Sequence, residues 1–288
     1  MKSAGWLCTC ACLVACASEN ELQVSEIGAP AVSWEEFQAQ PPVTWEAFRA
    51  ATPRELSAPN RFIVDGDLPI ADEQRLRDHY DAWLAQEYAA LAGGGSALSV
   101  LTALGADVLQ PVAQRNNLSY CISDTFGTRK AAVVTAMGLA TQSWSSRVAV
   151  TFVYKPEQDA TCTSSNTNVL FNVSPVSASY FAAAFFPDDS RASRQLLITT
   201  SAFTTTAGGR DFQGILRHET GHILGFRHEH INITCTGEGP ADSRIVNSYD
   251  VNSVMHYPQC RPTGTGGYRQ TELDFSGAAS LYGAPKIP

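Results

Sequence analysis

Residues 218–230 of this 288-residue chain read HETGHILGFRHEH, and they hold four of its six histidines. The stretch contains the spacing His-Glu-x-x-His-x-x-Gly-x-x-His, with His218, His222 and His228 at the fixed histidine positions. Neutral imidazole is the commonest metal ligand in proteins. The clustering therefore predicts a metal site, and it places the carboxylate of Glu219 close to the metal.

The surrounding sequence predicts a helix over Asp211–Leu224 that positions these side chains. Asp211 is a suitable N-cap, and apolar residues recur at helical spacing after it, at Phe212, Ile215, Leu216 and Ile223. Because His218 and His222 are four residues apart, they lie on one face of the helix and can reach one ion. Glu219 lies about 60° round the helix from His222. That position suits the general base for a zinc-activated water better than a ligand.

Gly225 predicts the end of this helix, because glycine readily adopts the left-handed conformation that reverses a chain. The reversal allows His228 to return as a third ligand. Three protein ligands leave one position of a tetrahedral zinc ion open, which is typical of a catalytic site. We therefore predict one catalytic Zn²⁺ ion, and we interpret His230 as a solvated residue just beyond the site.

A second motif follows at residues 249–257, which read YDVNSVMHY. Together with the histidine motif it resembles the metzincin clan of zinc endopeptidases, and the Ser-x-Met-His-Tyr form resembles their astacin branch. The resemblance implies that Met255 forms an apolar floor beneath the three histidines. It also implies that Tyr257 is catalytic, as an extra zinc ligand that swings away to stabilise the oxyanion. For both residues, ordinary burial in a protein core is the alternative.

The letters GFRHE at 225–229 also resemble astacins. This resemblance implies that Glu229 pairs with a new N-terminus made by activation. The chain departs from the animal astacins over 231–235, where those proteins carry a charged segment. The resemblance extends from about residue 112 to the end of the chain.

The predicted fold class is α+β, a metzincin-like two-lobed protease. A twisted mixed sheet and two long helices precede a loop-rich C-terminal lobe that carries the methionine-containing turn. Strands are expected over 118–123, 148–154, 169–173, 182–186 and 195–200, and helices over 129–145 and 274–282. By the resemblance, 182–186 is the edge strand along which an extended peptide pairs. The predicted domains are a signal peptide at 1–15, a prosegment and linker at 16–111, and a catalytic domain at 112–288.

The prosegment contains a candidate latency ligand. Residues 64–67 read VDGD and resemble the Phe-x-Gly-Asp motif of astacin prosegments, whose aspartate occupies the zinc before activation. A carboxylate is a competent zinc ligand and would displace the catalytic water. The hypothesis is that Asp67 keeps the precursor latent, and the alternative is a β-turn with two polar residues. An amphipathic helix over 71–91 and a glycine-rich connection at 93–96 are expected to follow.

The N-terminus resembles an export signal. Lys2 precedes a short apolar run, and the letters LVAC at 13–16 resemble the lipobox of bacterial lipoproteins, in which Cys16 would be lipidated. The letters ACA at 15–17 also fit cleavage by an ordinary signal peptidase. The first interpretation predicts a protein anchored by lipid to a membrane of the bacterial cell envelope. The second predicts a secreted protein.

Four cysteines remain beyond the signal and Cys16, at positions 121, 162, 235 and 260. An even number in an exported protein favours two disulfides, and three pairings exist. We prefer Cys121–Cys162 and Cys235–Cys260, because the second closes the segment between the histidine motif and Met255. Zinc ligation by cysteine is the alternative, although no C-x-x-C spacing supports it.

The sequence therefore predicts a zinc-dependent endopeptidase that cleaves proteins or peptides outside the cytoplasm and is made as a latent precursor. The alternatives are an exported zinc-binding lipoprotein on a protease-derived fold and a metal-dependent hydrolase of a non-peptide bond. A net charge of −8 argues against a nucleic-acid partner. No stretch has the length of a transmembrane helix, and no feature indicates an oligomeric state.

Overall fold

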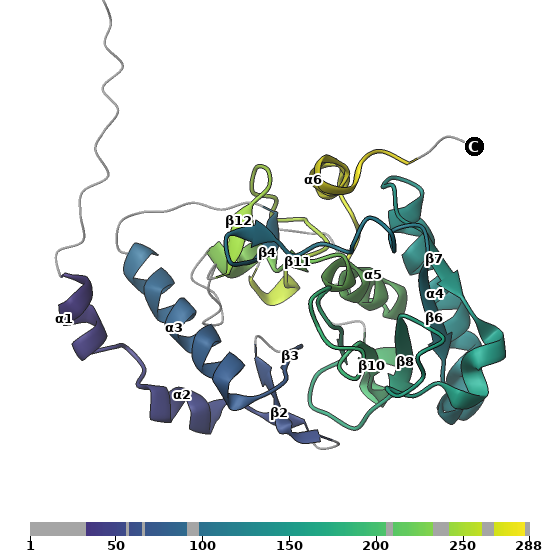
Figure 1. Ribbon diagram of the computed structural model, residues 1–288, viewed down its shortest axis with the longest axis horizontal. Helices are drawn as coiled ribbons and strands as arrows, with labels where there is room; N and C mark the ends of the chain where they lie inside the picture. Colours follow the sequence, from purple (N-terminus) through teal and green to yellow (C-terminus); the bar gives the residue numbers. More distant parts are fainter. Residues whose placement is uncertain are drawn as a thin grey trace, which may run out of the picture.

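The computed structural model describes residues 33–55, 58–64, 67–90, 98–205, 210–232, 242–260 and 268–285. Predictions for the signal peptide, Cys16, Cys235 and the connection at 93–96 lie outside these residues. Helix α5 lies near the centre of the molecule, with α3 and β2 on one side and α4 and β6 on the other (Figure 1). No helix within the described ranges is both long and apolar enough to cross a lipid bilayer.

A five-stranded mixed sheet has the strand order β7-β6-β8-β10-β9. Its members are β6 (Leu118–Ile122), β7 (Phe152–Tyr154), β8 (Phe171–Pro175), β9 (Ala182–Ala183) and β10 (Gln195–Ile198). Four strands run parallel, and β9 pairs antiparallel with β10 at the edge. All five overlap the ranges expected from the sequence. β9 is shorter than expected. Its pairing with β10 ends at Ala183, whereas the buried apolar run on which the expectation was based continues through Ala184 and Phe185.

Two helices, α4 (Lys130–Ser145) and α5 (Phe212–Ile223), pack against each other in the main core. Trp144 of α4 is fully buried, and its ring stacks on Phe226 with centroids 5.6 Å apart. Its indole Nε1 donates to the carbonyl of Arg217 at 3.0 Å. The side chain of Trp144 therefore joins α4 to Arg217 within α5 and to Phe226 just after α5. A third helix, α6 (Glu272–Tyr282), begins at a capping box formed by Thr271 and Asp274.

The predicted α+β fold class is confirmed. One feature was missed, a small sheet of the order β11-β4-β12 with β5 paired to β4. Its members are β4 (Ser99–Ala103), β5 (Ala106–Asp107), β11 (Phe226–Arg227) and β12 (Ser243–Ile245). The three strands that pair with β4 have only two or three residues, which is too short to show the alternation by which strands are recognised in a sequence. Short 3₁₀ helices complete the described chain: η1 (Asp124–Arg129), η2 (Pro156–Thr161), η3 (Thr200–Phe203), η5 (Glu229–Asn232) and η6 (Pro258–Cys260).

Strand β4 attaches residues 98–110 to the C-terminal part of the chain. Val100 pairs with Phe226 on one side and with Arg244 on the other, and Leu98 lies in the main core. The amide nitrogen Nε2 of Gln110 donates to the carbonyl that ends α5, that of Ile223, at 2.7 Å. Residues 98–110 thus pack with the described part of residues 112–285, which we call the body of the molecule. The predicted catalytic domain begins at 112, and the domain boundaries stay a prediction.

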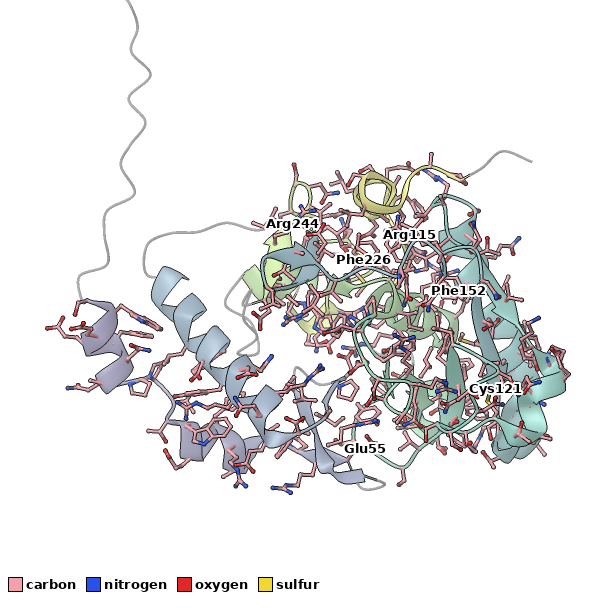
Figure 2. All side chains as sticks on the ribbon, in the orientation of Figure 1. Glu55, Arg115, Cys121, Phe152, Phe226 and Arg244 are labelled. Carbon is pink, nitrogen blue, oxygen red and sulfur yellow. A yellow bond between two sulfur atoms is a disulfide. The ribbon has the colours of Figure 1, made fainter. Side chains whose placement is uncertain are left out.

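The residues before β4 form a separate N-terminal layer (Figures 1 and 2). It comprises α1 (Trp34–Ala39), α2 (Trp45–Ala51), β1 (Arg54–Glu55), β2 (Ala58–Val64), β3 (Leu68–Ile70) and α3 (Glu73–Ala90). Helix α3 buries the apolar face that its pattern predicts, including Tyr80. Trp45 and Phe48 pack on that face, with centroids 5.5 and 5.3 Å from Tyr80. The layer therefore has a small apolar core of its own.

Cys121 and Cys162 form a disulfide, as one of the two preferred pairings predicts, so these two cysteines are not zinc ligands. Figure 2 shows Cys121 at the right of the molecule, away from the helices of the N-terminal layer at the left. Cys260 is also disulfide-bonded. Because Cys235 lies outside the described residues, the Cys235–Cys260 pairing stays a prediction.

The turn after α5 depends on Gly225, which has a φ of 92° and would, with a β-carbon, collide with the carbonyl of Val108. We expect Gly225→Ala to lower the free energy of unfolding by about 1–2 kcal/mol or more, through backbone strain and this collision. Gly138→Ala, in α4 where a β-carbon meets nothing within 4 Å, should raise it by roughly 0.5–1 kcal/mol. Urea unfolding measures both changes. Equal stability of the two variants would contradict the constraint at Gly225.

Candidate metal centre

Two elements bring the three motif histidines together. His218 and His222 project from α5, whose N-cap Asp211 accepts a hydrogen bond from the Gly214 amide at 2.5 Å, and His228 follows the turn at Gly225. All three imidazoles are buried. Their Nε2 atoms lie 3.0, 3.2 and 3.2 Å from one another. The structure therefore converges three potential ligand atoms on one point.

The orientation of the rings suits the binding of a cation. Nδ1 of His218 lies 2.7 Å from the carbonyl of Val254, and Nδ1 of His222 lies 2.7 Å from that of Phe226. Because a carbonyl only accepts, each Nδ1 carries the proton and each Nε2 presents a lone pair. Burial lowers the pKa of both imidazoles, which favours the neutral form. Nitrogens about 2.1 Å from a tetrahedral zinc ion stand about 3.4 Å apart, so the three residues fit zinc.

Asp67 of the N-terminal layer joins the three histidines. Its Oδ1 lies 3.4 Å from Nε2 of His228, and its Oδ2 lies 3.5 Å from Nε2 of His218. The four ligand atoms lie within 4.8 Å of one another and could hold a metal ion. Burial would raise the pKa of the Asp67 carboxyl, but His228 and His218 outweigh it and hold the pKa well below its usual value. The carboxylate of Asp67 therefore belongs to the group of four potential metal ligands, and its role in latency stays a prediction.

Glu219 is buried beside this group without belonging to it. The backbone amide of Ala184 donates to its carboxylate, while its Oε2 has no hydrogen-bond partner among the described residues. Burial raises the pKa of Glu219 well above its usual value, and the charge of Asp67 raises it further. Glu219 also lines a cavity of about 190 Å³ together with Asp67 and Tyr257. Glu219 therefore places a buried carboxyl group at the wall of this cavity.

Met255 lies against α5, and its role as a floor beneath the three histidines stays a prediction. Its side chain is fully buried, and its sulfur is the nearest atom to where a β-carbon on Gly221 would stand. A larger residue at position 221 would push the sulfur away. Gly221 therefore lets the methionine-containing turn approach the helix that carries His218 and His222.

The sequence did not identify Asp274, which holds this turn in place. Its carboxylate accepts hydrogen bonds from the hydroxyl of Ser253 at 2.5 Å and from the amides of Val254 and Thr271 at 2.9 and 2.8 Å. The carbonyl of Val254 in turn orients His218. Burial raises the pKa of Asp274 to about 6. The Thr-x-x-Asp capping box could have marked Asp274 as a fixed carboxylate, but not its contact with the turn.

Tyr257 stacks on two of the histidines, with its ring centroid 4.3 Å from that of His228 and 5.7 Å from that of His218. The prediction that His230 is solvated is wrong. His230 is fully buried, stacks on Tyr257 at 4.6 Å, and its Nδ1 accepts from the Tyr257 amide at 3.1 Å. A polar residue beyond a motif suggests exposure, but here a backbone hydrogen bond satisfies the buried ring.

Glu229 is also fully buried. Its Oε1 accepts from the amide of Asp250 at 2.7 Å, and its Oε2 has no hydrogen-bond partner within the described ranges. Burial raises the pKa of Glu229 to about 9. The pairing of Glu229 with a new N-terminus stays a prediction.

Comparisons with known proteins give structural likeness only. No protein-family model matches the chain, and no curated protein matches it. Among solved structures it is similar to myroilysin, with a TM-score of 0.46 and 14% identity over 64% of this chain and 98% of that one. It is also similar to high choriolytic enzyme 1, a hatching enzyme zinc-protease from the medaka fish Oryzias latipes. There the TM-score is 0.39, with 17% identity over 60% of this chain and 92% of that one. Because these values are low, the proposals below rest on the residues of this chain.

Two neighbouring histidines provide a matched test of the metal group. We expect His222→Ala to lower zinc affinity by several orders of magnitude, because one of three converging lone pairs is lost. His230→Ala should keep about one zinc per chain, because His230 is buried beside the group and outside it. Zinc content after dialysis against a weak chelator measures both. Loss of zinc in both variants, with the fold intact by circular dichroism, would contradict the assignment of ligands.

Proposed function

We propose that this chain is a zinc-dependent endopeptidase. The observation that carries the proposal is the convergence of three buried imidazole Nε2 atoms next to the carboxylate of Glu219, at the wall of a cavity. His218, His222 and His228 would hold the ion. A purely structural zinc site has no use for a buried carboxylate such as Glu219 beside its ligands.

In the proposed reaction, Glu219 is the general base. A bound zinc ion lowers the pKa of water towards about 7 and polarises a carbonyl group. Glu219 takes a proton from the attacking water and passes it to the leaving amine. Tyr257 lines the same cavity, and its hydroxyl donates a hydrogen bond to the oxyanion. Strand β9, at the edge of the sheet, offers backbone groups with which an extended peptide can pair.

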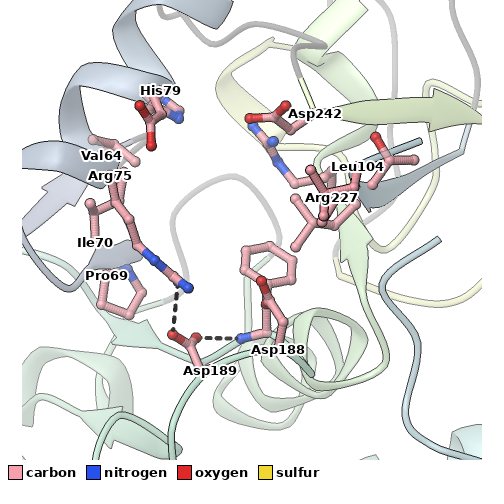
Figure 3. A pocket seen from close by; sticks show the side chains of 15 residues that line it. Val64, Pro69, Ile70, Arg75, His79, Leu104, Asp188, Asp189, Arg227 and Asp242 are labelled. Atoms are coloured by element: carbon pink, nitrogen blue, oxygen red, sulfur yellow. Dashed lines mark hydrogen bonds and ion pairs between the residues drawn. The ribbon is translucent and has the colours of Figure 1, made fainter. Parts of the chain in front are cut away.

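The proposal includes latency, because the N-terminal layer covers the region that a substrate would use. Ile63 of β2 packs against Tyr180, next to β9, and against Ala183 of β9 itself. Asp67 follows and reaches the histidine group. In Figure 3, Arg75 of α3 points to Asp189 of the body, an ion pair of 3.5 Å. These contacts support a prosegment that blocks the edge strand and supplies a carboxylate to the metal.

The remaining parts of the proposal rest on sequence. They are export, lipid attachment at Cys16, the cleavage of protein or peptide substrates outside the cytoplasm, and removal of the prosegment at activation. Cys16 lies outside the described residues. Labelling of cells with a radioactive fatty acid, comparing wild type with Cys16→Ser, would test the lipid anchor.

The general base is tested by Glu219→Ala in protein that has been activated by removal of the N-terminal layer from the full-length precursor. We expect both wild type and the variant to hold about one zinc ion, and only wild type to cleave unfolded casein. The rate should fall by at least about 100-fold, because proton transfer by a positioned side chain contributes this much or more. A chelator should stop the wild-type activity.

Glu157→Ala is the matched control, because Glu157 is exposed on η2 and far from the group in sequence. It should leave zinc content and rate unchanged. If wild type holds zinc and cleaves nothing after removal of the N-terminal layer, the endopeptidase proposal is lost. The zinc-binding lipoprotein or a hydrolase of another bond would then take its place.

Latency is tested by Asp67→Ala in the uncleaved precursor. We expect the variant to cleave casein at least tenfold faster than the wild-type precursor, because the carboxylate no longer competes for the open metal position. Asp81→Ala, which removes an exposed carboxylate of α3 paired with Arg77, should stay latent. Unchanged latency of Asp67→Ala, measured with zinc-loaded protein, would sink the hypothesis.

A further inference from the structure

A second cavity, of about 400 Å³, lies between the N-terminal layer and the body. The layer contributes Arg75 to its wall, and the body contributes Asp189. Figure 3 shows Arg75 pointing to Asp189, with Nη1 of the guanidinium 3.5 Å from Oδ1 of the carboxylate. The Arg75 side chain is 50% exposed, whereas that of Asp189 is only 9% exposed. The layer therefore places a cation against a nearly buried carboxylate of the body.

The body side of this cavity is negatively charged. The body residues described at its wall include three carboxylates, those of Asp188, Asp189 and Asp242, and one guanidinium, that of Arg227. Burial raises the pKa of Asp189 and Asp188 raises it further, while the charge of Arg75 lowers it. A nearby cation thus stabilises the ionised carboxylate. When the layer leaves, this stabilisation is lost, and the body presents a carboxylate that favours another cation.

The turn that carries Asp189 is held in place from within the body. Its Oδ2 accepts a hydrogen bond from the amide of Phe186 at 2.9 Å, and its own amide donates to the carbonyl of Phe186 at 3.0 Å. Arg194 donates from Nε to the carbonyl of Asp189 at 2.9 Å and from Nη2 to that of Pro187 at 3.0 Å. These contacts do not involve the layer. The carboxylate is therefore positioned in advance, which lowers the entropic cost of binding a ligand.

The same segment of chain connects this turn to the metal centre. The amide of Ala184 donates to the carboxylate of Glu219. Two residues later, the ring of Phe186 lies 5.5 Å from that of His222, in an edge contact, and its amide binds Asp189. Residues 184–189 therefore lead from the proposed general base, past a proposed zinc ligand, to the carboxylate of Asp189.

The side of the substrate that faces Asp189 follows from the proposed reaction. Glu219 gives its proton to the leaving amine, so the part of the substrate after the cut lies in the cavity that Glu219 lines together with residues 179–182. The part before the cut extends the other way, along residues 184–189. An extended peptide advances about 3.3 Å per residue, so a long side chain from one of the last few residues before the cut can reach Asp189.

We propose that Asp189 is a specificity-determining residue that binds an arginine or lysine side chain on the N-terminal side of the scissile bond. This inference rests on the endopeptidase function proposed above and names its substrate class. In the precursor, Arg75 occupies the place of that side chain. A carboxylate has about four acceptor sites, so the bond from Phe186 leaves room for two-point contact with a guanidinium. Arginine is therefore preferred over lysine, which binds as a point charge.

The test uses peptides that carry Arg, Lys, Gln or Glu at one of the four positions before the cut, in an otherwise uncharged sequence. Protein activated by removal of the N-terminal layer is compared with Asp189→Asn and Asp189→Arg. At one position we expect wild-type kcat/KM to favour Arg over Gln by roughly 5- to 30-fold, as hydrogen bonds between charged groups do. Asp189→Asn keeps an acceptor for the Phe186 amide and should bring this ratio close to one. Asp189→Arg should favour Glu.

Asp188→Asn is the matched control. It removes the same charge from the neighbouring residue, which is exposed, so water and salt screen its effect on a substrate. This variant should keep most of the wild-type preference. If it loses the preference as completely as Asp189→Asn does, the general field of the loop selects the substrate and the assignment to Asp189 is wrong. Zinc content and thermal stability show whether each variant is folded.

The remaining outcomes distinguish this proposal from the one on which it rests. If wild type cleaves the Arg and Gln peptides at similar rates at every position, or if the preference survives in Asp189→Asn, the role of Asp189 is overturned and the endopeptidase function stands. If the zinc-loaded, activated wild type cleaves neither the peptides nor unfolded casein, both proposals fall together.

Discussion

The convergence of three buried imidazole Nε2 atoms on one point is the constraint on which the rest of this structure depends. Backbone carbonyls of Val254 and Phe226 fix the rings by accepting their Nδ1 protons, so the opposite nitrogens have to face one another. Each supporting feature serves this arrangement, from the close contact of Met255 with Gly221 to the carboxylate of Asp274 behind the turn. Burying so many polar groups at one point is costly unless they are satisfied, and a shared metal ion is one partner that could satisfy them.

The features that could be predicted from the sequence were those encoded locally. The helix carrying His218 and His222, its N-cap and its terminating glycine follow from spacing and backbone preference. The strands of the large sheet overlap apolar runs in the sequence. What the sequence could not show depends on contacts between distant residues. The burial of His230 is set by the amide of Tyr257, and the role of Asp274 is set by the turn that it contacts.

The position of β4 has a consequence for the order in which the chain acquires its structure. Val100 pairs with Phe226 and Arg244, more than a hundred residues later, so during synthesis this strand is made long before its partners. Closing such long loops is slow, and an unpaired apolar strand is prone to aggregate meanwhile. The neighbouring N-terminal layer needs only local contacts, such as those of Trp45 and Phe48 with Tyr80. It can form early, so the part of the chain proposed to be discarded at maturation would be the first to gain order.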